Sequence, residues 1–138
     1  MLSMSKYPTT YSRVSAKAIV RDGAGRVLLC KENSPNWNLP GGGIEHTEQP
    51  LQGLQRELAE ELGFSFEADQ ATLVGARTFF VEEKDIYMLW LVYELHLTPT
   101  ITLGPEVTEA AFIDTTQFKD SQKRGEQLIY WATQTDRW

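Results

Sequence analysis

Three glutamates stand at a spacing that suits the binding of a metal ion. On a helix, Glu57, Glu60 and Glu61 fall within an arc of about 100°, with the leucines of the segment clustered about 110° away. The carboxylates therefore lie at the rim of the buried face, where like charges repel one another. No lysine lies in residues 32–83, and Arg56 is expected to project on the far flank of the acids. A hard divalent cation would neutralise them, because Mg²⁺ prefers oxygen ligands and binds carboxylates together with substrate phosphates.

A glycine-rich segment precedes these acids. Glycine permits backbone conformations closed to other residues and lets carbonyls or amides approach an ion or a phosphate. Taken alone, three acids at this spacing more often form a solvent-exposed helix face than a metal site, and a glycine loop alone is weak evidence for binding of an ion or a phosphate. Together they form one motif: Gly42, five residues, Glu48, seven residues, then Arg56-Glu57-Leu58-x-Glu60-Glu61-x-Gly63-Phe64. This motif resembles the Nudix box in every specified position, which chance would produce on the order of 10⁻⁹ times per start position.

The resemblance implies an α/β fold, the α/β/α sandwich with a mixed β-sheet, and a single domain over residues 1–138. It also implies a hydrolase that cleaves the diphosphate linkage of a nucleoside diphosphate derivative by attack of water on phosphorus. The substrate stays open between nucleoside triphosphates, sugar nucleotides and dinucleoside polyphosphates. The expected cofactor is Mg²⁺, with Mn²⁺ as a substitute.

The resemblance assigns roles to the residues of the box. Glu57 and Glu61 match the principal metal ligands, Glu60 an auxiliary ligand, and the Gly42 region a backbone-carbonyl ligand. Arg56 and Glu48 match a supporting ion pair that holds the glycine segment on the helix.

A general base that helps to deprotonate the attacking water contributes about 10²- to 10⁴-fold in such reactions. Some MutT-like members of the family place a catalytic glutamate about six residues before an aromatic residue that opens a strand. Glu106 and Phe112 have that separation, so Glu106 is the first candidate, with Glu60 next and Glu109 as a further alternative. Each of these acids could instead be a solvent-facing residue.

Aromatic side chains are candidates for stacking on a nucleobase. Trp37, in the segment before the glycines, and Phe80 are the expected substrate contacts, although aromatic residues in strands are more often part of a core. His46 is expected at the surface rather than at the metal, because an oxygen-rich site favours Mg²⁺ over zinc. Trp131 and Trp138 could cover the interface of a homodimer.

The elements that must position these residues follow from the apolar pattern. Alternation predicts a strand at 13–21 with residues 26–31 as its hairpin partner, a shaped loop at 32–43, and strands near 72–81, 86–98 and 110–114. The best helix is predicted at 49–62, with Thr47 as its N-cap and Gly63 at its end. An amphipathic helix is predicted within 116–134.

Composition limits the class of protein. The chain has 138 residues and a net charge of −6, so unassisted binding of nucleic acid is disfavoured and a phosphate ligand needs a cation. Apolar runs are too short to span a membrane, and the first six residues do not resemble a signal peptide, so a cytoplasmic location is expected. The single Cys30 is expected to be a buried, reduced thiol.

Two other functions stay open beside that of a hydrolase of small nucleotides. A nucleotide sensor on the same fold would need no turnover, but such modules commonly lose box acids that this chain keeps. A pyrophosphohydrolase of RNA 5′ ends would use the same chemistry, and the acidic charge and lack of a basic stripe disfavour it.

Overall fold

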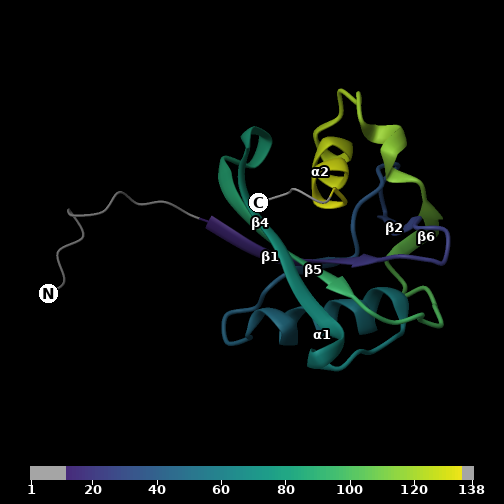
Figure 1. Ribbon diagram of the computed structural model, residues 1–138. Coiled ribbons are helices and arrows are strands. Elements are labelled where there is room, and N and C mark those ends of the chain that lie inside the picture. Colours follow the sequence, from purple (N-terminus) through teal and green to yellow (C-terminus); the bar gives the residue numbers. More distant parts are fainter. Residues whose placement is uncertain (1–11, 135–138) are drawn as a thin grey trace, which may run out of the picture.

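The computed structural model describes residues 12–134 (Figure 1). The first six residues, considered above as a signal peptide, and Trp138, considered as part of a homodimer interface, lie outside the described residues. Within residues 12–134, the regular structure consists of two α-helices and six strands. The strands are β1 (Ser12–Val20), β2 (Val27–Glu32), β3 (Gly41–Gly43), β4 (Ala71–Val81), β5 (Ile86–Leu95) and β6 (Val107–Ile113). The helices are α1 (Pro50–Leu62) and α2 (Arg124–Ala132), with 3₁₀ turns η2 (Ala68–Gln70), η3 (Glu82–Lys84) and η4 (Thr115–Phe118).

The strands form two sheets. One has four strands in the order β3-β1-β5-β4, with β1 parallel to β5 and the other pairs antiparallel. The second consists of β2 and β6, paired antiparallel. The predicted mixed sheet and α/β class are therefore confirmed. Among residues 12–134, no helix has the length and apolar character needed to cross a membrane.

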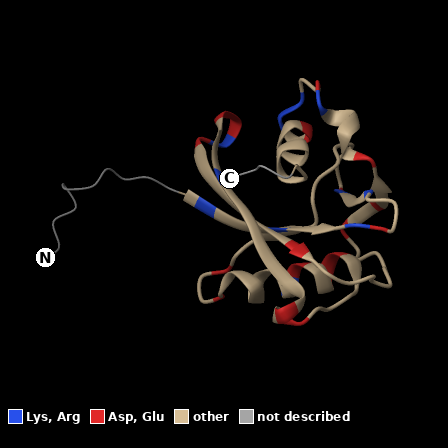
Figure 2. Cartoon of the chain, viewed as in Figure 1, with Lys and Arg blue, Asp and Glu red and all other residues tan. Residues whose placement is uncertain are grey.

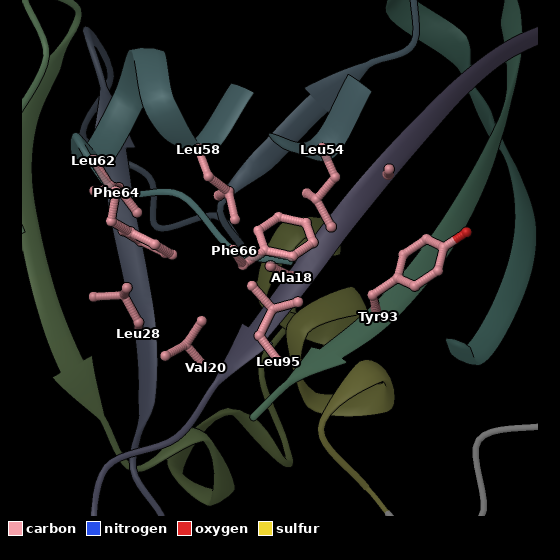
Figure 3. Packing of buried hydrophobic residues seen from close by; sticks show 11 residues of the cluster. Ala18, Val20, Leu28, Leu54, Leu58, Leu62, Phe64, Phe66, Tyr93 and Leu95 are labelled. Atoms are coloured by element: carbon pink, nitrogen blue, oxygen red, sulfur yellow. The ribbon is translucent and has the colours of Figure 1, made fainter. Parts of the chain in front are cut away.

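Two hydrophobic cores lie on opposite faces of the larger sheet. Helix α1 packs Leu54, Leu58 and Leu62 against one face of β1, including Ala18, as Figure 3 shows. Helix α2 lies on the other side of the sheet, where its apolar residues pack with Ile19 and neighbours from β5 (Figure 1). Alternate residues of β1 thus enter different cores, as the two-residue period of a strand requires.

The predicted hairpin partner of β1 is wrong. Strand β2 pairs with β6, and only an isolated bridge between Arg21 and Val27 joins it to β1. Strand β2 lies outside the larger sheet and is buried on both faces, since Leu28 belongs to the α1 core and Leu29 to the α2 core.

Both helices begin later than predicted. The N-cap of α1 is Gln49, not Thr47, because Pro50 occupies the first helical position and favours an extended residue before it. The predicted closing helix is interrupted between η4 and α2, where the hydroxyl of Ser121 accepts from the Lys123 amide at 3.1 Å and donates to Glu126 at 2.7 Å. These contacts fix the turn that leads into α2.

The glycine segment is not entirely a loop. Residues 41–43 form β3, which pairs with β1 so that Gly42 lies opposite Ala16. Gly41 has a φ of 119°, and a Cβ there would collide with the Ala16 carbonyl. Glycine at this position therefore allows β3 to approach β1 closely. Strand β5 ends at Leu95, before the predicted 98, and β6 begins at Val107 rather than near 110.

Candidate active site

Helix α1 presents the acids of the motif to a cavity of about 320 Å³. Its buried leucines fix the rotation of the helix, and Gly63 ends it in the left-handed conformation with a φ of 68°. We call this hollow the acidic cavity; its lining is Glu32, Glu57, Glu60, Glu61, Pro105, Glu106 and Val107. Five carboxylates thus face one space in a chain that is already acidic.

Arg56 and Glu48 form a bidentate ion pair beneath the cavity. The guanidinium donates from Nε to one carboxylate oxygen at 2.7 Å and from Nη2 to the other at 3.0 Å. Nη2 also donates to the carbonyl of Gly43 at 3.1 Å, which joins α1 to β3. Hydrogen bonds from Arg56 lower the pKa of Glu48 to about 2. Both residues therefore hold the glycine strand on the helix.

Arg56 also contacts the acids from which it was expected to point away. Its Nη1 lies 3.1 Å from an oxygen of Glu57 and 3.5 Å from one of Glu60. Glu60 lies one turn further along α1, where residues four apart are neighbours, and Glu57 is the next residue in the chain. The expectation that no protein cation approaches the acids is therefore wrong.

Glu57 lies directly against the glycine strand. A Cβ built on Gly42 would stand 2.8–2.9 Å from the carboxylate atoms of Glu57. Any side chain at position 42 would displace this carboxylate, so the space next to Glu57 depends on the glycine. The two candidate ligands are thus adjacent.

Glu61 is the buried acid of the site. Its side chain accepts from the Gly41 amide at 2.9 Å, and the residue is only 6% exposed. Burial and a hydrogen bond with Glu32 raise the pKa of Glu61 to about 9. Sequence reasoning missed Glu32, because the end of a strand about thirty residues away gives no sign that it meets α1.

Lys17, on β1, is the second residue that sequence reasoning missed. It is 5% exposed, and its ammonium donates to the carbonyls of Leu39 at 3.3 Å and of Gly41 at 3.4 Å. Burial lowers the pKa of Lys17, while the charge of Glu61 opposes that change. A lysine in the buried half of this strand, between Ala16 and Ala18, was the available signal. Its ammonium is a cation within reach of the acids.

Glu106 reaches the acidic cavity through a loop tied to the end of α1. The amide of Thr102 donates to the Leu62 carbonyl at 2.9 Å, and the amide of Gly104 donates to the Glu61 carbonyl at 2.8 Å. Glu109 instead lies on β6 with Lys31 at 3.5 Å, and it does not line the cavity. The loop thus brings one of the two candidate acids to the site.

A second cavity, of about 430 Å³, adjoins the first and shares Glu32 with it. We call it the aromatic cavity, because Trp37, Phe79 and Trp90 line it. The ring centroids of Phe79 and Trp90 lie 5.5 Å apart, edge to face, and the ammonium of Lys31 covers Trp37 at 4.4 Å. A flat, uncharged group such as a nucleobase fits such walls.

Phe80 does not line this cavity. It points to the opposite face of β4 from Phe79, where it is 37% exposed and lies 4.9 Å from the ring of Tyr87. A strand alternates its faces, so Phe79 and Phe80 had equal claims from sequence until the covered face was known. His46 is exposed, as expected, and Cys30 is a buried free thiol.

The donor set of the acidic cavity suits a hard divalent cation, although the carboxylates do not converge on one point. Among the residues that the structure describes, no three acidic, histidine or cysteine side chains stand close enough to hold an ion as they are. The ion pair of Arg56 with Glu57 and the 61% exposure of Glu60 account for this spread. Burial and the hydrogen bond with Glu32 raise the pKa of Glu61, and a divalent cation such as Mg²⁺ would favour its charged form.

The sequence is similar to those of several known proteins. An RNA pyrophosphohydrolase from Halorhodospira halophila is 41% identical over 66 residues, which are 47% of this chain and 36% of that protein. The nucleoside triphosphatase NudI from Klebsiella pneumoniae is 28% identical over 115 residues, 70% of this chain and 78% of that protein. For the other curated relatives, the aligned segment spans 31–46% of the relative.

Solved structures share the fold. The MutT protein from Methanosarcina mazei superimposes with a TM-score of 0.74 at 20% identity, covering 92% of this chain and 96% of that one. The family model of the NUDIX domain matches residues 11–132, which include the glycine strand, helix α1 and the residues that line both cavities. The chain belongs to the NUDIX domain family.

Proposed function

We propose that this chain is a Mg²⁺-dependent hydrolase that cleaves the diphosphate linkage of a nucleoside diphosphate derivative by attack of water on phosphorus. The observation that carries the proposal is the pair of adjoining cavities that share Glu32, one lined by five carboxylates and the other by aromatic rings. A diphosphate with its cation fits the first, and a nucleoside fits the second.

Several residues divide the work in the acidic cavity. Glu57, Glu60 and Glu61 are the proposed ligands of the cation, with the backbone of Gly42 beside Glu57. When bound, the cation would neutralise the diphosphate, lower the pKa of the attacking water and stabilise the leaving phosphate. The other residues of the site bind and orient.

Glu106 is the proposed general base. Its loop is fixed on the carboxyl end of α1 by two backbone hydrogen bonds, and its carboxylate lines the same cavity as the proposed ligands. A base placed there accepts the proton of the water that attacks phosphorus. Glu60 lines the cavity too and is the alternative.

In the aromatic cavity, Trp37 and Phe79 are the proposed walls around the nucleobase. Phe79 replaces Phe80 in this role, because Phe80 lies on the other face of β4. Arg56 and Glu48 are proposed to support the site by holding β3 on α1. The proposed substrate is a small nucleotide.

The proposal is tested by a panel of nucleoside triphosphates, sugar nucleotides and dinucleoside polyphosphates with Mg²⁺ in ¹⁸O-water, followed by phosphorus NMR. We expect turnover of at least one class, label on one phosphate product, and no turnover after chelation of the metal. A panel that stays intact in Mg²⁺ and in Mn²⁺ would favour the sensor alternative.

A matched pair of variants tests the acids. Glu57→Gln should lower kcat by about 10³-fold, because it removes one charged ligand at the place where charge develops. Glu82→Gln, an exposed acid in η3 outside both cavities, is the control and should retain the wild-type rate. Equal rates in the two variants would contradict the assignment of the ligands.

A further inference from the structure

Lys31 and Glu109 stand opposite each other on β2 and β6, and neither of them lines the acidic or the aromatic cavity. The ammonium of Lys31 lies 3.5 Å from a carboxylate oxygen of Glu109. The same ammonium lies 4.4 Å from the centroid of the Trp37 ring. One cation thus joins an acid of the smaller sheet to the side chain proposed as a wall of the nucleobase site.

The backbone sets these three side chains in one row. The segment before β3 turns back on β2, where Cys30 and Asn38 exchange two backbone hydrogen bonds of 2.9 Å. In antiparallel structure, such a pair is followed by one without hydrogen bonds, in which the side chains lie closer together. Lys31 and Trp37 are the next residues outward and occupy that position. On its other side, Lys31 is opposite Glu109 in the register of β2 and β6.

The Trp37 ring depends on this row for its orientation. Within residues 12–134, its indole nitrogen makes no hydrogen bond, and the ring packs against the α2 core while it is only partly buried. A cation over the face of an indole is attracted by the quadrupole of the ring. Glu109 in turn limits the positions that the ammonium can take. The contact with Lys31 is therefore the polar interaction that orients the ring.

These contacts are too exposed to contribute much to the stability of the fold. The side chain of Lys31 is 23% exposed and that of Glu109 is 54% exposed, and ion pairs at such sites contribute little. Glu109 also stands apart from the proposed metal ligands, which lie on α1, where Figure 2 shows red segments. A substitution of Lys31 or Glu109 should therefore leave the fold and the acids of α1 in place.

We infer that Lys31 and Glu109 are positioning residues, which hold the Trp37 ring in the orientation that stacks on the nucleobase of the substrate. The inference rests on the proposed function, which places the base at Trp37. Lys31 covers one face of the ring, and Trp37 lines the aromatic cavity, so the base stacks on the face that the ammonium leaves free. Glu109, the further candidate for the general base, thus acts on binding through Lys31 and not on the attacking water.

The orientation of the ring is measured first, without a ligand. In ¹⁵N-labelled protein, the indole resonance of Trp37 is identified by its absence in Trp37→Leu. Lys31→Met should broaden or split this resonance, because the ring then samples several orientations, whereas Lys31→Arg keeps a cation over the ring and should give one sharp resonance. Lys119→Met, an exposed lysine outside both cavities, is the control and should leave it unchanged. A sharp, unsplit resonance in Lys31→Met would overturn the inference.

Binding links the orientation of the ring to the nucleotide. The affinities of AMP and GMP are measured by titration calorimetry in metal-free buffer. For the nucleotide that the wild-type protein binds more tightly, Lys31→Met should weaken binding about threefold, the size expected of one partly exposed cation–π contact, and Glu109→Gln about twofold. Lys31→Arg should restore the wild-type affinity. Equal affinities of the wild-type protein and Lys31→Met would overturn the inference alone, whereas no binding of either nucleotide by the wild-type protein would refute the nucleobase site of the proposed function as well.

The variant Trp37→Leu separates positioning from direct contact. If Lys31 acts through the ring, Lys31→Met should weaken binding no further when Trp37 is already replaced. A threefold loss that persists in the double variant would mean that Lys31 contacts the nucleotide itself, and it would overturn the positioning role.

Kinetics separate binding from chemistry. With Mg²⁺ and a substrate that the wild-type protein hydrolyses, Lys31→Met should raise KM about threefold and keep kcat within about twofold of the wild-type value. A fall in kcat at constant KM would contradict the inference, because the pair would then act on the reaction. No hydrolysis of any substrate would refute the proposed hydrolase, and the affinities of AMP and GMP would still support or overturn the role of Lys31 and Glu109.

Discussion

The acidic cavity and the aromatic cavity are neighbours with different origins in the chain. The acids of the first come mainly from α1, within a stretch of 23 residues that also holds the glycine strand. The walls of the second come from β1, β4, β5, the segment before β3 and the start of α2. The candidate metal ligands thus come from one local segment, whereas the candidate contacts to the substrate come from segments that lie far apart in the chain.

After Glu57→Gln, the largest effect is expected where the acidic cavity meets the loop before β6. Glu106→Gln should lower kcat by about 10²-fold with little change in Mn²⁺ affinity, because a general base is lost while the proposed ligands stay. Steady-state kinetics and calorimetric titration with Mn²⁺ measure the two quantities. A normal rate would move the role of the base to Glu60, and a lost affinity would make Glu106 a ligand.

The contact between the glycine strand and the helix gives the next effect. Gly42→Ala adds a Cβ less than 3.0 Å from the Glu57 carboxylate, which must move away, so kcat should fall about 10- to 100-fold while the fold persists. Gly23→Ala is the control, because Gly23 has open space around its Cα and no positive φ. Circular dichroism and turnover measure both variants, and equal activities would separate Gly42 from the site.

Changes in the aromatic cavity should affect binding more than chemistry. Trp37→Leu should raise KM about tenfold with a smaller change in kcat, because stacking on the base is lost. Phe80→Leu, on the other face of β4, should change KM by less than twofold. If Phe80→Leu has the larger effect, the nucleoside lies on the opposite face of the sheet.

The ion pair of Arg56 and Glu48 should make the free energy of unfolding depend on pH in the acidic range. The pKa of Glu48 is lowered from 4.5 to about 2, so its contribution to stability is complete above pH 4.5 and is lost as the pH falls towards 2. Arg56→Gln removes the cause of the shift and should flatten this part of the stability profile. Urea unfolding of both proteins between pH 2 and 6 measures the difference, and parallel profiles would contradict it.

Sequence reasoning succeeded where neighbours in space are neighbours along the chain. The helical period alone places Glu57, Glu60 and Glu61 on one side of α1, and Gly63 ends the helix as expected. The N-cap was misjudged because Pro50 has a stronger preference for the first position than Thr47 has for capping. Local chemistry was sufficient for the helix and its acids.

The remainder depended on tertiary packing. Lys17 and Glu32 join the site because β1 and β2 both lie between the two hydrophobic cores. The alternation of apolar residues did not indicate that β2 pairs with β6. The choice of Phe79 over Phe80 depends on which face of β4 is covered by α2. Contacts between residues so far apart in the chain have no local signature.

The central claim is that the acidic cavity binds a divalent cation between α1 and the glycine strand. Crystals soaked in millimolar Mn²⁺ and measured for anomalous scattering test it most directly. The account predicts a manganese peak between the carboxylates of Glu57 and Glu61 near the Gly42 carbonyl, with Arg56 released from Glu57. An empty map, with the Arg56–Glu57 ion pair still at its 3.1 Å separation, would contradict it.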